Sequence, residues 1–146
     1  MSGAASGVDK ERARGFVASI PHSRDLGMDL VDIGPGWAHL SLPYHERLIG
    51  DPETGVLHGG VVTALLDTCG GAAVLSHPEA GLSTATIDLR IDYMRPAAPE
   101  RELHARAECY RMTRYVAFVR AVAYTDSPDE PVAAAHGAFT VARAVE

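Results

Sequence analysis

The chain has 146 residues, of which 47% are hydrophobic and 22% are charged, and its formal net charge is −6. This length predicts one domain that buries about two thirds of the surface of its unfolded chain. An acidic balance with no basic run argues against nucleic acid or an anionic membrane as the main partner.

Residues 1–7 are small and polar, and we expect them to be disordered ahead of a single domain over residues 8–146. They lack the apolar segment of a signal peptide, which by default predicts a cytoplasmic protein. Between residues 8 and 20, apolar side chains spaced among charges predict a short amphipathic helix that Pro21 ends.

Two strand-like pieces follow at residues 28–33 and 37–42, and the Gly-Pro-Gly between them is a strong turn signal. They therefore predict a hairpin. The next stretch, residues 44–56, is rich in glycine, proline and aspartate and is expected to be a loop.

The longest apolar stretch runs from residue 61 to residue 75, where the only polar side chains are those of Thr63, Asp67, Thr68 and Cys69. A helix here is apolar on nearly every face, so we expect it to be buried all round and to form the core. With its flanks it would run about 25 to 30 Å, and it is too short and too rich in glycine for a membrane span. Two adjacent mid-helix glycines cost about 1 kcal/mol each relative to alanine, which predicts a close backbone approach at Gly70 and Gly71.

Alternating apolar and polar residues at 85–94 and again at 103–110 predict two strands, each with one buried face. Residues 115–119 are apolar on both faces, as in a central strand, and residues 132–141 should return antiparallel to it. The expected fold is α+β. An antiparallel five-stranded sheet wraps around one long central helix, and a short N-terminal helix precedes both.

Asp67 is the first candidate site residue, because a carboxylate in an apolar helix is costly unless something pairs with it or uses it. It could bond to Thr63 in a structural role or act as a general base or nucleophile, and we favour the catalytic role. The triplet of His58, Gly59 and Gly60 lies where the helix would begin. Unpaired N–H groups and the helix dipole make that point a candidate oxyanion site.

His58 and Asp67 leave opposite sides of one helix, roughly 13 Å apart along its axis, so they cannot form a pair within one chain. Either they do separate jobs, or the helix start of one subunit faces the Asp67 of another across a two-fold axis. We favour the second arrangement.

Cys69 and Cys109 lie in apolar surroundings and are expected to be free thiols. A Cys69 nucleophile is disfavoured because Cys69 would lie roughly 16 Å from His58 along the helix. The histidines show no metal-ligand spacing, and there is no Gly-x-Ser-x-Gly motif, although spacing alone leaves a Ser/His/Asp triad open.

Four arginines fall at predicted strand ends and turns. Each is singly best explained as surface charge, but as a group they could bind the phosphates of a nucleotide-bearing substrate. They are Arg90, Arg95, Arg111 and Arg114.

Three motifs together resemble the hotdog-fold acyl-CoA thioesterases of the phenylacetic-acid-degradation (PaaI-like) family. They are Gly55-Val56-Leu57-His58-Gly59-Gly60, then Leu65-Leu66-Asp67, then the strand Ile87-Asp88-Leu89-Arg90-Ile91-Asp92-Tyr93-Met94-Arg95-Pro96-Ala97. The resemblance runs from about Leu26 to the C-terminus.

The resemblance implies a helix wrapped in an antiparallel sheet, dimers joined edge to edge, and usually a tetramer. Within such an assembly the Gly59 N–H would polarise the thioester carbonyl at the helix start, beside Gly60. Asp67 of the facing subunit would attack as nucleophile or activate water, and His58 would orient the acyl group or its sulfur.

The same resemblance implies that Thr86 holds the water and that Arg95 and Arg114 approach the coenzyme A moiety. It implies no metal and no bound cofactor. Relatives commonly carry asparagine six residues before the histidine to complete the carbonyl site, whereas this chain has Pro52.

The expected function is therefore hydrolysis of a medium-chain or aromatic acyl-CoA by a homodimer or homotetramer. The alternative is a non-catalytic domain that binds or senses acyl-CoA. A hotdog hydratase fits less well, because the Asp/His signature of the hydratases is not evident here.

Overall fold

The computed structural model describes residues 7–145, so the predicted disorder of residues 1–6 lies outside the described residues. Its elements in chain order are α1 (Lys10–Ser19), α2 (Pro21–Leu26), β1 (Asp29–Gly34), β2 (Trp37–Leu42), a short 3-10 helix (Glu46–Leu48), α3 (Gly59–Leu75), β3 (Thr86–Tyr93), β4 (Leu103–Met112), β5 (Val116–Tyr124) and β6 (Ala133–Thr140).

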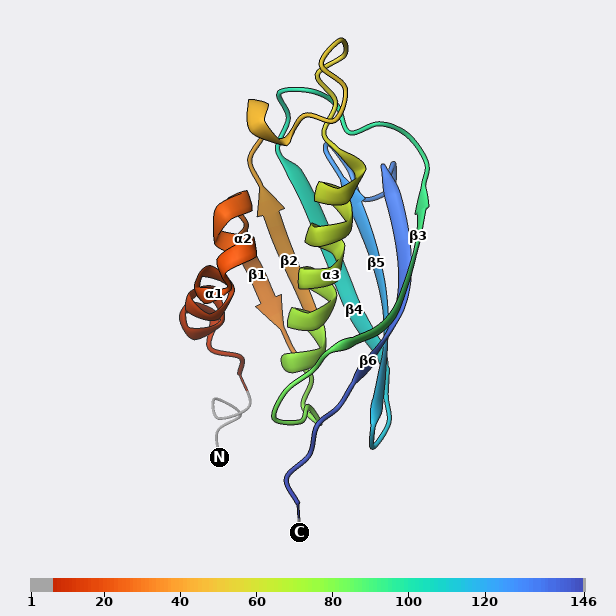
Figure 1. Cartoon of the computed structure of the whole chain (residues 1–146). Coiled ribbons are helices and arrows are strands. Elements are labelled where there is room, and N and C mark those ends of the chain that lie inside the picture. The colour runs from red at the N-terminus through yellow and green to blue at the C-terminus, as the bar shows by residue number, and fades with distance from the viewer. Residues whose placement is uncertain (1–6, 146) are drawn as a thin grey trace.

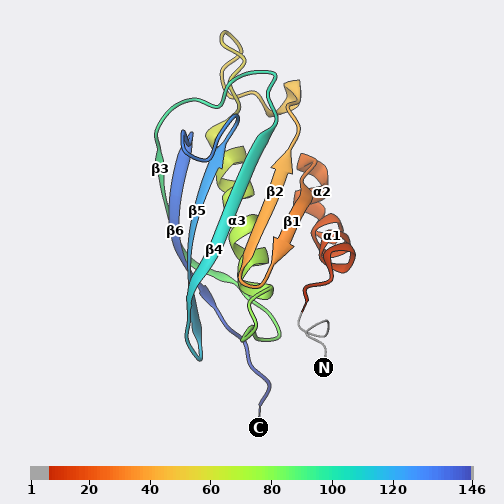
Figure 2. The same cartoon turned by 180° about the vertical axis from the view of Figure 1, so that it is seen from behind.

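All six strands belong to one antiparallel sheet in the order β1-β2-β4-β5-β6-β3. The long helix α3 lies along one face of this sheet, and the opposite face carries no helix among the described residues (Figures 1 and 2). The α+β arrangement of a sheet around one long helix, with a short helix before it, is confirmed.

The expected total of five strands is one too few, because each of the six strand segments predicted above, including 115–119 and 132–141, forms a separate strand of the sheet. The N-terminal helix is also followed by a second helix that the sequence reading missed. Pro21 does end α1, yet it then begins α2, since proline fits the first position of a helix.

The core lies between α3 and the sheet. Along β4 the residues that face the helix are buried and alternate with more exposed ones, as the predicted period of two requires. On the helix side, Gly70 lets the two layers approach closely. A Cβ atom at this position would lie 2.8 Å from Cζ of Phe139 on β6. The expected close approach is therefore confirmed at Gly70.

Gly71 has a different environment. A Cβ atom there would meet only the Thr84 side chain, at 3.9 Å, and the position is half-exposed. Packing within the chain therefore does not require glycine at residue 71.

The expectation that α3 is buried on every face is wrong for the single chain. A stripe along the helix, spaced at intervals of one turn, remains half-exposed on the side away from the sheet. It consists of Thr63, Ala64, Asp67, Thr68 and Gly71. None of the helices within residues 7–145 has the length and apolar character needed to cross a bilayer.

The predicted buried face of β3 is also absent from the single chain. Leu89 and Ile91 are half-buried, whereas Ile87 is 55% and Tyr93 is 54% exposed. The reason is the position of β3 at the end of the sheet, where it pairs only with β6 among the described strands. The alternation of apolar and polar residues predicts which face of a strand is apolar, but it does not predict whether the same chain or another one buries that face.

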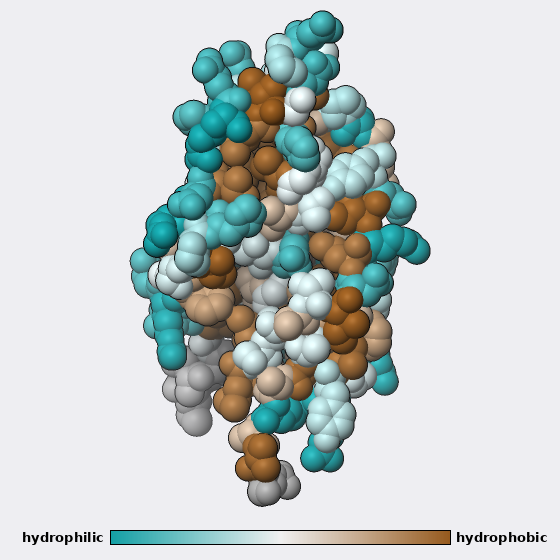
Figure 3. All heavy atoms as spheres, in the orientation of Figure 1, coloured by the Kyte–Doolittle hydropathy of each residue, from teal (hydrophilic) through white to brown (hydrophobic). Residues whose placement is uncertain are grey.

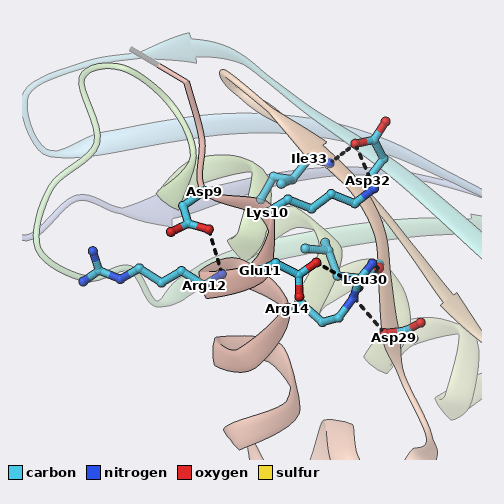
Figure 4. A network of polar contacts seen from close by, with 9 residues as sticks. All are labelled: Asp9, Lys10, Glu11, Arg12, Arg14, Asp29, Leu30, Asp32 and Ile33. Atoms are coloured by element: carbon cyan, nitrogen blue, oxygen red, sulfur yellow. Dashed lines mark hydrogen bonds and ion pairs between the residues drawn. The ribbon is translucent and has the colours of Figure 1, made fainter. Parts of the chain in front are cut away.

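The other edge of the sheet, β1, is covered by α1 and α2 (Figures 1 and 2). Val17 anchors α1 in the core, and Arg14 donates from Nη2 to the Leu30 carbonyl at 3.0 Å (Figure 4). Ion pairs from Arg14 to Asp29 and from Lys10 to Asp32 surround this contact, and being exposed they contribute little stability. The sheet thus has one covered edge and one open edge.

A cluster of rings lies on the face of the sheet opposite α3. Nε2 of His39 lies 3.0 Å from Nδ1 of His104 and 3.4 Å from the hydroxyl of Tyr124. Burial, reinforced by the positive charge of Arg106, lowers the pKa of His39 to about 4. His39 is consequently neutral near pH 7 and takes part in hydrogen bonding as a neutral ring.

The two mid-helix glycines lead to opposite expectations on substitution. Gly70→Ala should lower the free energy of unfolding by about 1–3 kcal/mol, because its methyl group would overlap Phe139. Gly71→Ala should raise it by about 0.5–1 kcal/mol, because helix propensity improves with no clash inside the chain. Urea unfolding of both variants beside the wild type measures the two effects. A destabilising Gly71→Ala would contradict this account and would indicate that another chain packs against residue 71.

Candidate active site

The start of α3 is fixed by the loop before it. The N–H of His58 donates to the Leu48 carbonyl at 2.9 Å, and the N–H of Gly50 donates to the Val56 carbonyl at 2.9 Å. A Cβ atom at Gly50 would lie 2.7 Å from Cα of His58, so glycine is needed for the loop to pass this close. The loop therefore holds the first residues of the helix in place.

His58 caps the helix with its side chain. Its Nδ1 accepts a hydrogen bond from the Gly60 N–H at 2.8 Å. An imidazole that accepts at Nδ1 carries its proton on Nε2, so the exposed edge of the ring is a donor. Gly60 is part of this geometry, because a Cβ atom there would lie 2.9 Å from Nδ1 of His58.

The N–H of Gly59 has no hydrogen-bond partner within residues 7–145. It is exposed at the first position of α3, where the positive end of the helix dipole adds to its attraction for an oxyanion. A Cβ atom at Gly59 would make only an ordinary contact, at 3.6 Å, with the ring of Tyr93. Packing inside the chain therefore does not demand glycine, whereas close approach of a ligand to the N–H would.

Two side chains that the sequence reading did not single out for the site surround the Gly59 carbonyl. The hydroxyl oxygen of Tyr93 lies 3.1 Å and that of Thr63 lies 3.2 Å from the Gly59 carbonyl oxygen, so either hydroxyl can donate to it. The two hydroxyls also form a short hydrogen bond with each other. Tyr93 was expected only as a buried strand residue, and no local pattern indicates that its hydroxyl reaches the helix.

A cavity of about 320 Å³ opens beside Gly59, with Tyr93 and Arg95 in its wall. The other side chains in its wall are apolar. They are Leu57 and Val62, at and before the first turns of α3, Met94, Pro96 and Ala97 after β3, and Val132 before β6. Nη2 of Arg95 donates to the Glu130 carbonyl at 2.6 Å. The cavity therefore combines an apolar lining with one positive charge.

Asp67 lies further along α3, in the half-exposed stripe. Its Oδ1 accepts a hydrogen bond from Oγ1 of Thr86, at the start of β3, at 2.6 Å. Thr63, the structural partner considered for Asp67, instead bonds to Gly59 and Tyr93. The carboxylate is thus held in place by β3 and still faces the open side of the helix.

The structure brings the predicted residues together in two groups rather than one. Gly59, His58 and the cavity lie at the start of α3, whereas the Asp67–Thr86 pair lies about 12 Å further along the helix. No hydrogen bond or ion pair joins His58 to Asp67 in the part of the chain that the structure describes. Arg114 lies in the β4–β5 turn, at the end of the sheet remote from the start of α3 (Figure 1).

The open face between these groups is not strongly polar. In Figure 3 white and brown side chains fill the middle of the face over α3 and β3, and the teal hydrophilic side chains gather mainly at its rim. Ile87, Tyr93 and Met94 are large apolar or aromatic side chains exposed along β3 and just after it. Such a face is typical of a contact surface.

Cys69 is buried on the sheet side of α3, and its Sγ donates to the carbonyls of Ala38 and Ala105 at 3.4 Å each. Burial raises its thiol pKa to about 12, so the nucleophilic thiolate does not form near neutral pH. Both cysteines are free, as expected. Among residues 7–145, no group of three or more His, Cys, Asp or Glu side chains is placed to hold a metal ion.

Pro52 is exposed in the loop before α3 and has no N–H to donate. The neighbouring Asp51 carboxylate accepts from the Glu53 N–H at 3.0 Å and from the Thr54 hydroxyl at 3.0 Å. The polar groups of the loop therefore form hydrogen bonds within the loop itself, and the described contacts add no donor beside Gly59.

The sequence matches the model of the family described as "Thioesterase superfamily" over residues 54–132. A protein of Halobacterium salinarum that carries the provisional name of an esterase is 36% identical, and the match covers 94% of this chain and 98% of that protein. The medium/long-chain acyl-CoA thioesterase YigI of Escherichia coli is 34% identical over 59% of this chain and 64% of YigI, slightly under two thirds of its length.

Solved structures share the architecture. A Pseudomonas aeruginosa protein superposes with a TM-score of 0.80 at 41% identity, covering 91% of this chain and 98% of that chain. The PaaI protein of the Escherichia coli phenylacetic acid degradation operon superposes with a TM-score of 0.77 over 92% of this chain and 96% of that chain. At 19% identity this second likeness concerns the fold alone.

Proposed function

The chain belongs to the thioesterase superfamily, and on this basis we propose that it hydrolyses an acyl-CoA with a medium-chain or aromatic acyl group to the free acid and coenzyme A. The observation that carries this proposal is the division of the site between the two ends of β3. Thr86, at the start of β3, holds the Asp67 carboxylate, and Tyr93, at its end, contacts Gly59.

The two ends of β3 are roughly 23 Å apart, since a strand rises about 3.3 Å per residue. Asp67 and Gly59 themselves are separated by about 12 Å along α3, so one chain cannot bring both to a single carbonyl group. Antiparallel pairing of β3 with the β3 of a second subunit removes this difficulty. A two-fold axis at Arg90 would set Leu89 of one subunit opposite Ile91 of the other, and the bulge between Thr86 and Asp88 would then bring Thr86 of one subunit beside Tyr93 of the other, so that each dimer would hold two equal sites.

The open edge at β3 supports this pairing. An unpaired strand with exposed apolar side chains is a template for another strand, and here the opposite edge of the sheet is already covered by α1 and α2. The dimer would also bury the exposed Ile87. Two such dimers would form the tetramer that the resemblance to the PaaI-like proteins implies.

In the shared site the thioester carbonyl oxygen would accept a hydrogen bond from the Gly59 N–H. This donor and the dipole of α3 would together stabilise the oxyanion that forms on attack. Asp67 of the facing subunit would either attack the carbonyl carbon or take a proton from water that attacks it. Thr86 would hold that carboxylate or the water. If water attacks, breaking of the C–S bond gives the free acid directly. If Asp67 attacks, breaking of the C–S bond leaves a mixed anhydride on Asp67, which water then hydrolyses to the free acid and the carboxylate. In both cases coenzyme A leaves as the thiol once its sulfur is protonated.

The remaining predicted residues would bind the rest of the substrate. His58 presents an Nε2–H donor toward the acyl group or its sulfur, and Gly60 keeps that ring in place. Arg95 borders the cavity beside Gly59 and would meet the phosphates of coenzyme A. Arg114 is remote within one chain, so it would take part only through the second subunit. The reaction requires no cofactor.

The acyl group is assigned from three supports. The cavity beside Gly59 has about 320 Å³ and mostly apolar walls, which suits an alkyl chain or a ring. YigI is named for medium-chain and long-chain acyl-CoA. The aromatic alternative rests on the sequence motifs that resemble the PaaI-like family.

Asp67→Asn tests the catalytic carboxylate. The near-isosteric amide keeps a hydrogen bond to Thr86 but is neither a base nor a nucleophile, so kcat should fall by at least about 100-fold. Release of free thiol from a panel of aliphatic and aromatic acyl-CoAs measures the effect. If the wild type binds acyl-CoA but hydrolyses none faster than Asp67→Asn does, the thioesterase proposal fails. The alternative of a domain that only binds or senses acyl-CoA would then replace it. Pro52, at the position where relatives commonly carry asparagine, supports this alternative.

Gly59→Pro tests the backbone donor. Proline suits the first helical position, and the ψ of 136° at His58 is one that a residue before proline adopts readily. The change removes only the N–H, so kcat/KM should fall by about 100- to 1,000-fold while the fold persists. Gly59→Ala is the matched control, because it retains the N–H and should stay about tenfold or more above the proline variant. Equal activity of the two variants would exclude the Gly59 N–H from the reaction.

Mixing the two inactive variants tests the shared site. If Gly59 and Asp67 act across the interface, subunit exchange between Gly59→Pro and Asp67→Asn gives mixed dimers with one intact site each. An equal mixture should recover about a quarter of the wild-type turnover. If both residues acted within one chain, no mixed dimer would contain an intact site and no activity would return.

A further inference from the structure

The first turn of α3 has few side chains to hold it. Gly59 and Gly60 are consecutive, exposed and without side chains, and glycine allows the backbone more conformational freedom than any other residue. Helix ends also fray more readily than helix interiors. A donor that must keep its direction toward a substrate oxygen therefore needs support from elsewhere in the fold.

That support comes from the end of β3. The hydroxyl oxygens of Tyr93 and Thr63 lie 3.1 Å and 3.2 Å from the Gly59 carbonyl oxygen, and they are also within hydrogen-bond distance of each other. Each hydroxyl has one proton, so two arrangements satisfy the three oxygens. Either Tyr93 donates to Thr63 and Thr63 donates to Gly59, or the two residues exchange roles. In both arrangements one continuous network ties the strand to the helix start.

We propose that Tyr93 is a positioning residue: its hydroxyl, together with that of Thr63, holds the carbonyl of the Gly59–Gly60 peptide. This anchor limits rotation about the Gly59 Cα and so keeps the preceding His58–Gly59 peptide, which carries the Gly59 N–H, directed at the substrate carbonyl. This inference rests on the proposed thioester hydrolysis. Tyr93 itself does not touch the reacting atoms.

The location of Tyr93 gives the contact a second consequence. It lies on the edge strand that would pair with the β3 of a second subunit. In that subunit Thr86 of β3 holds Asp67 of α3. Tyr93 thus connects the backbone donor to the same strand that sets the distance across the interface. A donor and a carboxylate that come from different subunits require such a connection, because displacement by about 1 Å can cost about 100-fold in rate.

The test removes each hydroxyl singly and compares kcat with KM. Tyr93→Phe keeps the ring against Gly59 and deletes the oxygen, so kcat should fall about 3- to 10-fold, as for loss of one hydrogen bond, with KM changed less than about twofold. Thr63→Val should do the same, and Thr63→Ser, which restores the hydroxyl, should rescue turnover. Tyr110→Phe, an exposed tyrosine of β4, is the matched control and should leave kcat unchanged.

A second measurement separates positioning from general stability. In the Gly59→Pro background the donor is absent, so Tyr93→Phe should lower kcat no further. A merely structural Tyr93 would lower the melting temperature and would reduce activity in both backgrounds, which would overturn the inference. If the wild type hydrolyses acyl-CoA and Tyr93→Phe has the same kcat, this inference fails while the proposed function stands. A wild type that hydrolyses no acyl-CoA would overturn the proposed function and this inference with it.

Discussion

The close packing of α3 on the sheet is the constraint on which the rest of the structure depends. Gly70 allows it, because any side chain there would overlap Phe139. With the helix pressed against the sheet on one side, its other side is left with small and weakly polar residues that no segment among residues 7–145 fully covers. The helix therefore provides both the core of the subunit and, on its open side, the surface that carries Asp67.

The edge strand β3 converts this arrangement into two separated halves of a site. It binds the middle of α3 through Thr86 and the start of α3 through Tyr93, so a single strand sets the position of both the carboxylate and the backbone donor. Because the two contacts lie at opposite ends of β3, antiparallel pairing with a second copy is the simplest way to bring them together. Assembly and chemistry would then depend on the same hydrogen-bonded edge.

The division of roles along α3 follows from ordinary helix physics. At its start, unpaired N–H groups and the dipole favour negative charge, and the His58 side chain uses one donor while Gly59 keeps another free. Further along, the carboxylate of Asp67 is half-exposed and is held by the hydroxyl of Thr86. Cys69, two residues after Asp67, faces the sheet instead, and burial raises the pKa of its thiol, so it is unreactive near neutral pH.

Local sequence determined the elements and much of the chemistry. Apolar periodicity located α3 and the strands, glycine at residues 59 and 60 marked the helix start, and a lone aspartate in an apolar helix marked Asp67. Tertiary structure decided what these patterns leave open. The alternation of β3 indicates residues that seek burial, yet only strand order shows that β3 is an edge that one chain leaves exposed. Likewise the contacts of Tyr93 with Gly59 and of Thr86 with Asp67 join residues 34 and 19 positions apart, and no local pattern encodes pairs that form only when β3 folds back along the helix.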